Sequence, residues 1–364
     1  MKIKTITCHE VYNYGASLQE YALLTYLGGL GHDCETIHYK PSYLSNHFNL
    51  KAVSARFNIF PIKYVYLLAK LPVRLQALKR KKAFDAFSKK HIKTGSQLYK
   101  TNEQLKYSIP EADAYICGSD QIWNSFFQNG KDPAFYLEFV PDTKLKISYA
   151  ASFAIDEIEN ELKPFVKEKV KRINHISVRE TSGVHILSEL GILNATQVLD
   201  PVFLLSANYW KTTFVETIED KYIFVYDFDS NPFIKKIAQK LAKKNQLKIV
   251  TVNKNIKYAT TNYWLEGPEM FLSLISNAQL VISNSFHAVA FSLIFEKQFI
   301  VVNRIEAINT RMRDLLALFN LTDYLISKND SFEQLKTIEF TKINKLKEQH
   351  IQSSKQFLIN ALLN

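Results

Sequence analysis

The sequence contains little cysteine, glycine or proline. Its 364 residues include three cysteines, 10 glycines and 10 prolines. Cys8, Cys34 and Cys117 are odd in number and far apart, and no CxxC pair occurs. Neither a disulfide framework nor a structural zinc site is therefore predicted, and we expect reduced thiols, as in the cytoplasm. The scarcity of glycine and proline also excludes collagen-like and low-complexity chains.

Long hydrophobic runs are also missing. A membrane-spanning helix needs about 20 consecutive apolar residues. The longest candidate, YVYLLAKLPVRL at 64–75, is interrupted by Lys70, Pro72 and Arg74. The first residues, MKIKTITCHEVYNYGASLQ, lack the apolar core of a signal peptide. We therefore expect a soluble, cytoplasmic protein.

The chain is basic, because 46 Lys and Arg stand against 35 Asp and Glu and give a net charge of +11. This balance favours an anionic partner, such as a phosphorylated or carboxylated small molecule or a membrane surface. Solvated surface lysines explain it equally well. No zinc-finger, basic-zipper or RNA-recognition pattern accompanies the charge, so we expect no nucleic-acid partner.

Part of the positive charge is concentrated in residues 63–93. This segment holds ten Lys or Arg and one acidic residue, with Leu68, Leu71, Leu75 and Leu78 at helical spacing. A basic amphipathic helix can lie in the interface of an anionic membrane, which would place the protein at the inner face of the cell membrane. The alternative is a helix whose leucines face the protein core and whose lysines face water.

Short apolar runs alternate with helical patterns, which indicates βαβ crossovers and parallel sheets. A chain of this length is expected to form two domains of roughly 150–200 residues each. We predict an α/β protein in which two Rossmann-like domains, residues 1–200 and 201–342, face a cleft, while a helix at 343–364 packs back on the chain. The predicted strands are 3–7, 34–39, 112–120, 145–152, 175–180, 196–200, 221–228, 246–252, 280–283 and 298–302.

Ligands of open parallel sheets bind beyond the carboxyl ends of the strands, so the residues that follow each strand are candidate site residues. Asn13, Tyr14 and Gly15 stand where a dinucleotide-binding protein carries GxGxxG, and the absence of that motif argues against NAD and FAD. This loop either binds an anion or caps a helix. Asp120 could bind sugar hydroxyls or act as a base, and Trp123 could stack on a sugar ring. The alternative for these two residues is a helix cap over a core tryptophan.

Two later strands end in residues that suit an anion. Arg179 lies at the carboxyl end of the strand predicted at 175–180. Its guanidinium can hold carboxylate or phosphate through two hydrogen bonds, unless it forms only a surface ion pair with Glu180. Asn284 and Ser285 precede a helix whose first turn carries His287. Together with the helix N-terminus they form a candidate anion site. His287 is either a structural histidine or one that acts on the bound anion.

Seven blocks of the sequence, taken in order, resemble the bacterial polysaccharide pyruvyl transferase family. They run from about residue 12 to residue 320, so the resemblance covers most of the chain. It implies a fold with two Rossmann-like domains of glycosyltransferase B type, in agreement with the strand pattern. The blocks are NYGASLQEYAL, GSDQIWN, SYAASF, ISVRE, LDPVFLL, GPEMFLSLISNAQLVISNSFHAVAFSLIF and NTRMRDLL.

The resemblance also implies an activity. A pyruvyl unit would pass from phosphoenolpyruvate to two hydroxyls of a sugar, giving a pyruvate ketal on a bacterial surface polysaccharide or its lipid-linked precursor, with release of phosphate. Phosphoenolpyruvate would be a co-substrate, and no cofactor or metal is expected. The reaction needs a proton for the methylene carbon, a base for the sugar hydroxyl, and cationic groups for a carboxylate and a phosphate.

The same resemblance implies roles for the candidate residues. The first domain would hold the acceptor and the second the donor. His287 would act as the general acid or as a phosphate ligand, and Asp120 would be the second catalytic residue. The donor would be bound by Arg179, Asn284, Ser285 and Arg311, and the acceptor by Asn13, Tyr14, Asp120 and Trp123.

One position departs from the family pattern. Several members carry arginine two residues before the histidine, where this chain has Ser285. A serine cannot replace a guanidinium in binding a doubly charged phosphate. We therefore expect either that Arg311, Arg313 or Lys297 reaches the site, or that the donor binds differently.

Two other functions are compatible with the sequence. A glycosyltransferase of the same fold would use a nucleotide sugar, and Glu266 and Glu269 are its candidate residues for holding the ribose or diphosphate. A non-enzymatic protein of glycan assembly would bind a membrane or a partner through residues 63–93.

Overall fold

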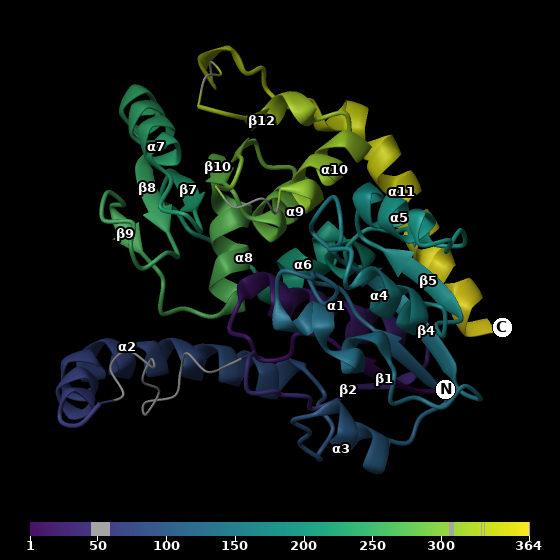
Figure 1. The fold of residues 1–364 in the computed structure, drawn as a ribbon. Coiled ribbons are helices and arrows are strands. Elements are labelled where there is room, and N and C mark those ends of the chain that lie inside the picture. Colours follow the sequence, from purple (N-terminus) through teal and green to yellow (C-terminus); the bar gives the residue numbers. More distant parts are fainter. Residues whose placement is uncertain (45–58, 306–308, 329, 331, 364) are drawn as a thin grey trace.

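The computed structural model describes residues 1–44, 59–305, 309–328, 330 and 332–363. They form two α/β domains, each built on a parallel sheet of six strands (Figure 1). The predicted fold class, two Rossmann-like domains that face a cleft, is thus confirmed.

The N-terminal sheet has the strand order β2-β1-β3-β4-β5-β6. All of its strand pairs are parallel, so the carboxyl ends of the strands lie along one edge. The strands are β1 (Lys2–Ile6), β2 (Asp33–Thr36), β3 (Ala114–Cys117), β4 (Leu145–Ala151), β5 (His175–Val178) and β6 (Thr196–Gln197). The helices of this part of the chain are α1 (Tyr14–Gly29), α2 (Ile62–His91), α3 (Asn102–Tyr107), α4 (Lys163–Val170) and α5 (Thr181–Glu189).

The C-terminal sheet has the order β12-β11-β10-β7-β8-β9 and is also parallel throughout. Its strands are β7 (Tyr222–Tyr226), β8 (Lys248–Thr251), β9 (Thr261–Asn262), β10 (Leu280–Ser283), β11 (Phe299–Val302) and β12 (Leu325–Ile326). Its helices are α7 (Pro232–Asn245), α8 (Pro268–Asn277), α9 (Phe286–Phe295) and α10 (Thr310–Leu318).

Two edge strands and two helices were not predicted from the sequence, and one of these helices is α3, which has only six residues. Strands β9 and β12 have two residues each, which is too short to give a periodic pattern. The segment 201–220, for which the sequence predicts no helix or strand, contains a 3₁₀ helix at Pro201–Leu204 and helix α6 (Ala207–Phe214). Trp210 and Phe214 of α6 are buried, so one side of this short helix packs into the core.

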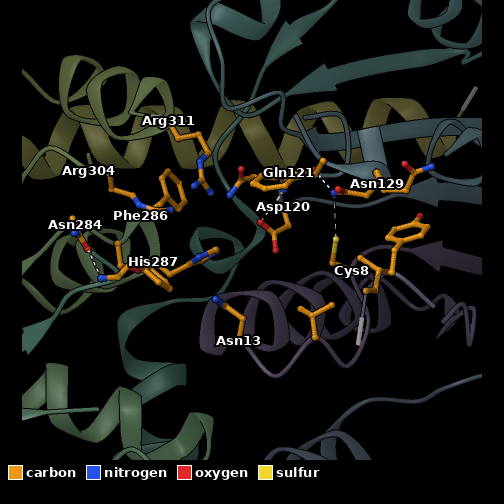
Figure 2. A pocket seen from close by; sticks show the side chains of 17 residues that line it. Cys8, Asn13, Asp120, Gln121, Asn129, Asn284, Phe286, His287, Arg304 and Arg311 are labelled. Carbon is orange, nitrogen blue, oxygen red and sulfur yellow. Dashed lines mark hydrogen bonds between the residues drawn. The ribbon is translucent and has the colours of Figure 1, made fainter. Parts of the chain in front are cut away.

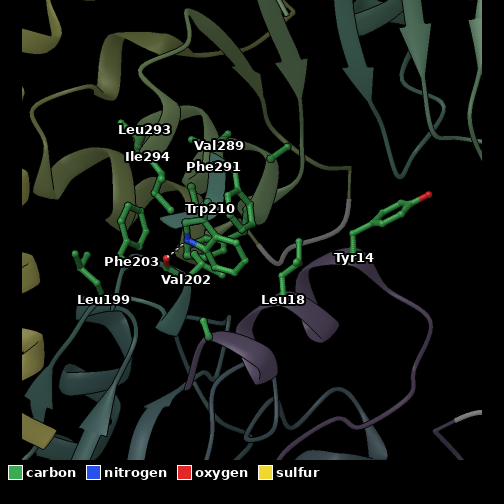
Figure 3. Close-up of a cluster of buried hydrophobic side chains, with 14 of the residues drawn as sticks. Tyr14, Leu18, Leu199, Val202, Phe203, Trp210, Val289, Phe291, Leu293 and Ile294 are labelled. Carbon is green, nitrogen blue, oxygen red and sulfur yellow. Dashed lines mark hydrogen bonds between the residues drawn. The ribbon is translucent and has the colours of Figure 1, made fainter. Parts of the chain in front are cut away.

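The two domains share one hydrophobic core. It includes Trp210, whose indole Nε1 donates to the carbonyl of Val202 (3.0 Å) and whose ring packs edge-on against Phe291 of α9 (Figure 3). Tyr14 of α1 stacks on Phe271 of α8, with 4.7 Å between the ring centroids. This shared core holds the carboxyl ends of the two sheets in a fixed relation.

Helix α11 (Phe340–Leu363) packs across both domains (Figure 1). Lys347 near its start donates to the carbonyl of Leu293 in α9 (3.1 Å). Further along, the Ser354 hydroxyl oxygen accepts from the backbone N–H of Leu199 in the N-terminal domain (2.9 Å). The helix thereby fastens the segment that follows β6 to the second domain.

Helix α2 projects from the body of the protein along its first half (Figure 1). Leu68, Leu71 and Leu75 are exposed, Leu68 by 70%. The alternative that these leucines face the core is therefore wrong, because that half of the helix extends beyond the domains. Phe84 and Phe87 in the second half are buried instead. No helix in the described part of the chain is long and apolar enough to cross a membrane.

Candidate active site

A cavity of about 440 Å³ lies where the carboxyl ends of the two sheets meet (Figure 2). Loops that follow β1, β3, β7, β10 and β11 line it, as expected for ligand sites of parallel sheets. Six predicted site residues are brought together at its wall: Asn13, Asp120, Asn284, Ser285, His287 and Arg311.

His287 lies beside a carboxylate of the other domain. Its Nε2 is 3.5 Å from Oδ2 of Asp200, an ion-pair distance, and Nη1 of Arg179 donates to the same oxygen at 2.6 Å. Burial acts to raise the pKa of Asp200, but the charges and hydrogen bonds of His287 and Arg179 hold it well below its usual value. Asp200 is therefore a fixed negative charge that lies between the imidazole of His287 and the guanidinium of Arg179.

Asp200 is held in place by two further hydrogen bonds. The Ser119 hydroxyl donates to Oδ2 (2.9 Å), and the backbone N–H of Val202 donates to Oδ1 (3.1 Å). Sequence reasoning assigned Asp200 no role, although it lies in the block LDPVFLL. It ends the strand predicted at 196–200, so the rule that candidate residues follow strand ends could have found it.

The ring of His287 is positioned by Gly15 in the first turn of α1. A β-carbon on Gly15 would lie 1.9 Å from Nδ1 of His287, so no larger residue fits without moving the ring. Asn13 caps this helix, because its Oδ1 accepts from the backbone N–H groups of Gly15 (2.9 Å) and Ala16 (3.3 Å). The loop after β1 is thus both a helix cap and part of the cavity wall.

Two buried guanidinium groups supply hydrogen-bond donors. Nε and Nη2 of Arg179 and Nε of Arg311 are buried and make no hydrogen bond to the residues that the structure describes. Both groups lie over the ring of Phe286, at 4.4 Å and 5.9 Å from its centroid. Burial and the charge of Arg179 lower the pKa of Arg311 to about 10, so Arg311 is charged at neutral pH. Unmatched buried donors of this kind suit a carboxylate or phosphate ligand.

The N-terminus of α9 adds backbone donors. Ser285 is its N-cap residue, and its side chain makes no capping hydrogen bond, so the amide groups of the first turn remain available to an anion. The side chain of Asn284 is engaged instead, since its Nδ2 donates to Asp227 (2.8 Å) and its Oδ1 accepts from the backbone of Phe228 (2.9 Å). Asn284 therefore shapes the loop after β7.

Asp120 lies across the cavity from α9. Its φ of 77° is in the left-handed region, a strained conformation for a residue other than glycine that is often found at functional sites. Its Oδ1 accepts from the backbone N–H of Gln121 (2.8 Å). Figure 2 shows the carboxylate pointing into the cavity.

The structure does not bring Trp123 or Tyr14 to the cavity. Trp123 is 0% exposed, stacks on Tyr136 at 5.3 Å and donates from Nε1 to the carbonyl of Phe135 (3.0 Å). Tyr14 is also fully buried, in the contact between the domains. Neither ring can contact a sugar in the cavity, which corrects the expectation that they face the acceptor. An aromatic residue just after a strand can lie either in the core or at the cavity wall, and the sequence alone does not distinguish the two positions.

Serine at position 285 leaves the cavity without the guanidinium that an arginine there would give, and a residue of α10 supplies one. Of the three candidates, Arg311 lines the cavity. Arg313 pairs with Asp156 (2.8 Å) instead, and Lys297 follows the opposite end of α9.

Arg304 is a second cation that the sequence analysis did not identify. It lines the cavity and pairs with Asp229 at 3.2 Å. It follows β11, so the carboxyl-end rule could have pointed to it.

The residues considered for a nucleotide sugar lie elsewhere. Glu269 belongs to the first turn of α8, 3.7 Å from Nε2 of His91, and Glu266 is exposed in the preceding loop. Neither lines the 440 Å³ cavity.

One group among the described residues has the spacing of metal ligands. The ligand atoms of His9, Glu10 and His38 lie within 4.8 Å of one another. Nδ1 of His9 is 2.8 Å from Glu20, and the ammonium of Lys40 is hydrogen-bonded to Glu10. Because Lys40 already balances the charge of Glu10, we interpret the group as a charge network behind the cavity.

Paired Rossmann-like domains with a cavity between the ends of their sheets define a fold of glycosyltransferase B type. The family model for polysaccharide pyruvyl transferase matches residues 13–305. The chain therefore belongs to the polysaccharide pyruvyl transferase family, and the protein is a transferase.

The solved structures with a similar backbone arrangement share little sequence identity with this protein. UDP-N-acetylglucosamine 2-epimerase from Rickettsia bellii has a TM-score of 0.49 and 11% identity, over 100% of this chain and 96% of that chain. MurG from Acinetobacter baumannii has a TM-score of 0.44 and 9% identity, over 99% of this chain and 98% of that chain. Likenesses at this level carry no inference about function. A comparison with curated proteins finds no match to the chain.

Proposed function

We propose that the protein transfers the pyruvyl unit of phosphoenolpyruvate to two hydroxyls of a sugar, on a bacterial surface polysaccharide or its lipid-linked precursor. The observation that carries this proposal is the convergence of His287, Arg311 and the N-terminus of α9 at one cavity, with Arg179 buried behind them against Asp200. Phosphoenolpyruvate carries a carboxylate and a phosphate, the groups that buried guanidinium and amide donors bind. Membership of the family supports the same reaction.

The donor sits with its phosphate and carboxylate between Arg311, Arg179 and the first turn of α9. His287, held between Asp200 and Gly15, gives a proton to the methylene carbon of the enolpyruvyl group. The central carbon then carries positive character, and the carboxylate of Asp120, which lines the cavity, stabilises it.

Two sugar hydroxyls attack this central carbon in turn. Asp120, which points into the cavity, takes the proton from the first hydroxyl as it adds. Phosphate leaves, and the second hydroxyl closes the ketal. One hydroxyl proton replaces the proton given to the methylene carbon, and the other leaves with the phosphate. The atoms therefore balance without a metal or a nucleotide.

Binding of the donor tests this proposal directly. Phosphoenolpyruvate is expected to raise the melting temperature of the protein, and UDP and ADP are expected to have no effect. The stabilisation should be lost in Arg311→Gln and retained in Arg313→Gln, a change of equal charge outside the cavity. Stabilisation by a nucleotide and none by phosphoenolpyruvate would instead identify a glycosyltransferase that uses a nucleotide sugar.

We also propose that phosphoenolpyruvate is the only co-substrate and that no metal takes part. Turnover is then expected to be the same before and after exhaustive treatment with EDTA. Activity that is lost with EDTA and restored by one divalent cation would contradict this part of the proposal.

A further inference from the structure

The projecting half of α2 is apolar and exposed. Among the described residues, nine of the large exposed hydrophobic side chains lie between residues 59 and 75. They include Tyr64, Leu68 and Leu75, which are 57%, 70% and 51% exposed and stand on one face of the helix at helical spacing. An exposed apolar concentration of this size indicates a binding surface.

Basic residues flank this apolar surface with no acidic residue among them. Lys63, Lys70 and Arg74 form a second stripe along the same half of the helix, again at helical spacing. The sequence has no aspartate or glutamate between Glu35 and Asp85. All charged side chains of the projecting half are therefore positive.

We propose that the projecting half of α2, residues 62–79, docks on an anionic lipid bilayer. Its apolar face would enter the boundary between headgroups and acyl chains, and its basic stripe would pair with lipid phosphates. A second copy of this chain that pairs through the same helix is the competing occupant, but this pairing would bring two basic stripes together with no acidic residue from either projecting half. An anionic bilayer supplies both the apolar and the negatively charged complement.

The other half of α2 connects this surface to the cavities between the domains. Nη1 of Arg80 donates to the hydroxyl of Tyr14 and to the carbonyl of Trp264, both at 2.6 Å, and so ties the helix to both domains. Arg80 also lines a cavity of about 360 Å³ that shares Asn13 and Phe228 with the 440 Å³ cavity.

A bilayer on the first half of α2 would thus lie near the entrance to the site, where a lipid-linked acceptor would arrive. This last link rests on the proposed function, whereas the docking itself does not.

Vesicle binding tests the docking separately from the reaction. The full chain is incubated with vesicles of phosphatidylcholine alone and of phosphatidylcholine with phosphatidylglycerol, and the bound protein is measured by sedimentation. We expect binding to the anionic vesicles only, weakened by salt. Replacing Lys63, Lys70 and Arg74 by glutamine should weaken it about a hundredfold, since each basic residue near an anionic surface adds roughly fivefold.

Two further variants separate the apolar contribution from general charge. Leu68→Glu with Leu75→Glu should abolish vesicle binding and leave the melting temperature unchanged, because both side chains are exposed. The matched control replaces Lys236, Lys243 and Lys244 of α7, which are exposed on the other domain, by glutamine. This control changes the net charge equally and should bind vesicles as the wild type does.

Three results would overturn the proposal. The first is no binding to anionic vesicles, and the second is equal loss of binding in the α7 control. The third is a dimer, seen by light scattering, that the Leu68→Glu, Leu75→Glu variant dissociates, because α2 would then be an interface between copies. Failure of vesicle binding would leave phosphate release from phosphoenolpyruvate with a soluble acceptor intact, so the docking and the reaction can fail independently.

Discussion

The imidazole of His287 packs directly on the backbone of Gly15, so the N-termini of α9 and α1 meet across the two domains. A β-carbon on Gly15 would come within 1.9 Å of Nδ1 and 2.2 Å of Cγ of the ring. On its other side, the same ring faces Asp200 at 3.5 Å. His287 is therefore fixed by groups of the N-terminal domain, and the site exists only where both domains meet.

Gly15→Ala is expected to lower kcat about a hundredfold, because a displacement of the catalytic group of about 1 Å can cost that much. The new methyl group has no free space and must push the His287 ring away from the cavity. The matched control is Gly28→Ala in the same helix, where a β-carbon meets nothing within 4 Å. The control should keep full activity, and equal activity of the two variants would contradict the assigned role of Gly15.

Asp200→Asn is expected to lower the free energy of unfolding by about 3 kcal/mol at pH 7, because the buried charge of Arg179 loses its hydrogen-bonded carboxylate at 2.6 Å and keeps only Glu180 at 3.9 Å. The pKa of Asp200 is lowered in the folded protein. Its contribution is therefore present above the unfolded-state pKa of about 3.9 and lost as the pH falls toward the folded-state value.

Urea unfolding at several pH values measures this effect. The difference in stability between wild type and Asp200→Asn should narrow as the pH is lowered below about 4. A difference that is constant with pH would show that the carboxylate charge is not what stabilises this cluster.

Arg311→Gln is expected to raise KM for phosphoenolpyruvate at least about tenfold, since a charge-assisted hydrogen bond contributes about 1.5–3 kcal/mol. Arg311→Lys keeps the charge but loses the two-pronged geometry of the guanidinium, so its KM should lie between those of the wild type and Arg311→Gln. Steady-state kinetics with varied phosphoenolpyruvate concentration measure this KM. Arg313→Gln is the control, and an equal rise in KM there would mean that the effect is one of general charge.

Trp123→Phe is expected to lower the free energy of unfolding by about 2 kcal/mol and to leave KM for the acceptor unchanged. The indole is fully buried and loses its hydrogen bond to Phe135, but it does not reach the cavity. Chemical denaturation and acceptor kinetics check the two parts. A raised KM for the acceptor with unchanged stability would show that Trp123 contacts the acceptor after all.

The sequence predicted the architecture well, because alternating strands and helices and the carboxyl-end rule depend on local pattern. That rule points to Asp120, Ser285 and His287, and the structure brings all three to one cavity. It says nothing about which way a side chain turns once a loop has folded. Trp123 therefore lies in the core, although its position in the chain equally suits a sugar-binding residue.

Contacts between segments far apart in the chain could not be predicted in the same way. The pairing of Asp200 with His287 depends on how the two domains pack, which the shared core around Trp210 decides. The same is true of Gly15, whose small size is explained only by the ring that lies against it. The exposure of Leu68 also could not be predicted, because an amphipathic pattern does not say whether the apolar face of a helix contacts protein or solvent.

The central claim is that this cavity converts phosphoenolpyruvate with the help of His287. The most direct measurement is phosphate release from phosphoenolpyruvate with a panel of bacterial glycan acceptors, for the wild type and for His287→Ala. The account predicts acceptor-dependent release by the wild type and a loss of about a hundredfold or more in the variant. Equal release by the two proteins, or acceptor-dependent turnover of a nucleotide sugar without any of phosphoenolpyruvate, would contradict it.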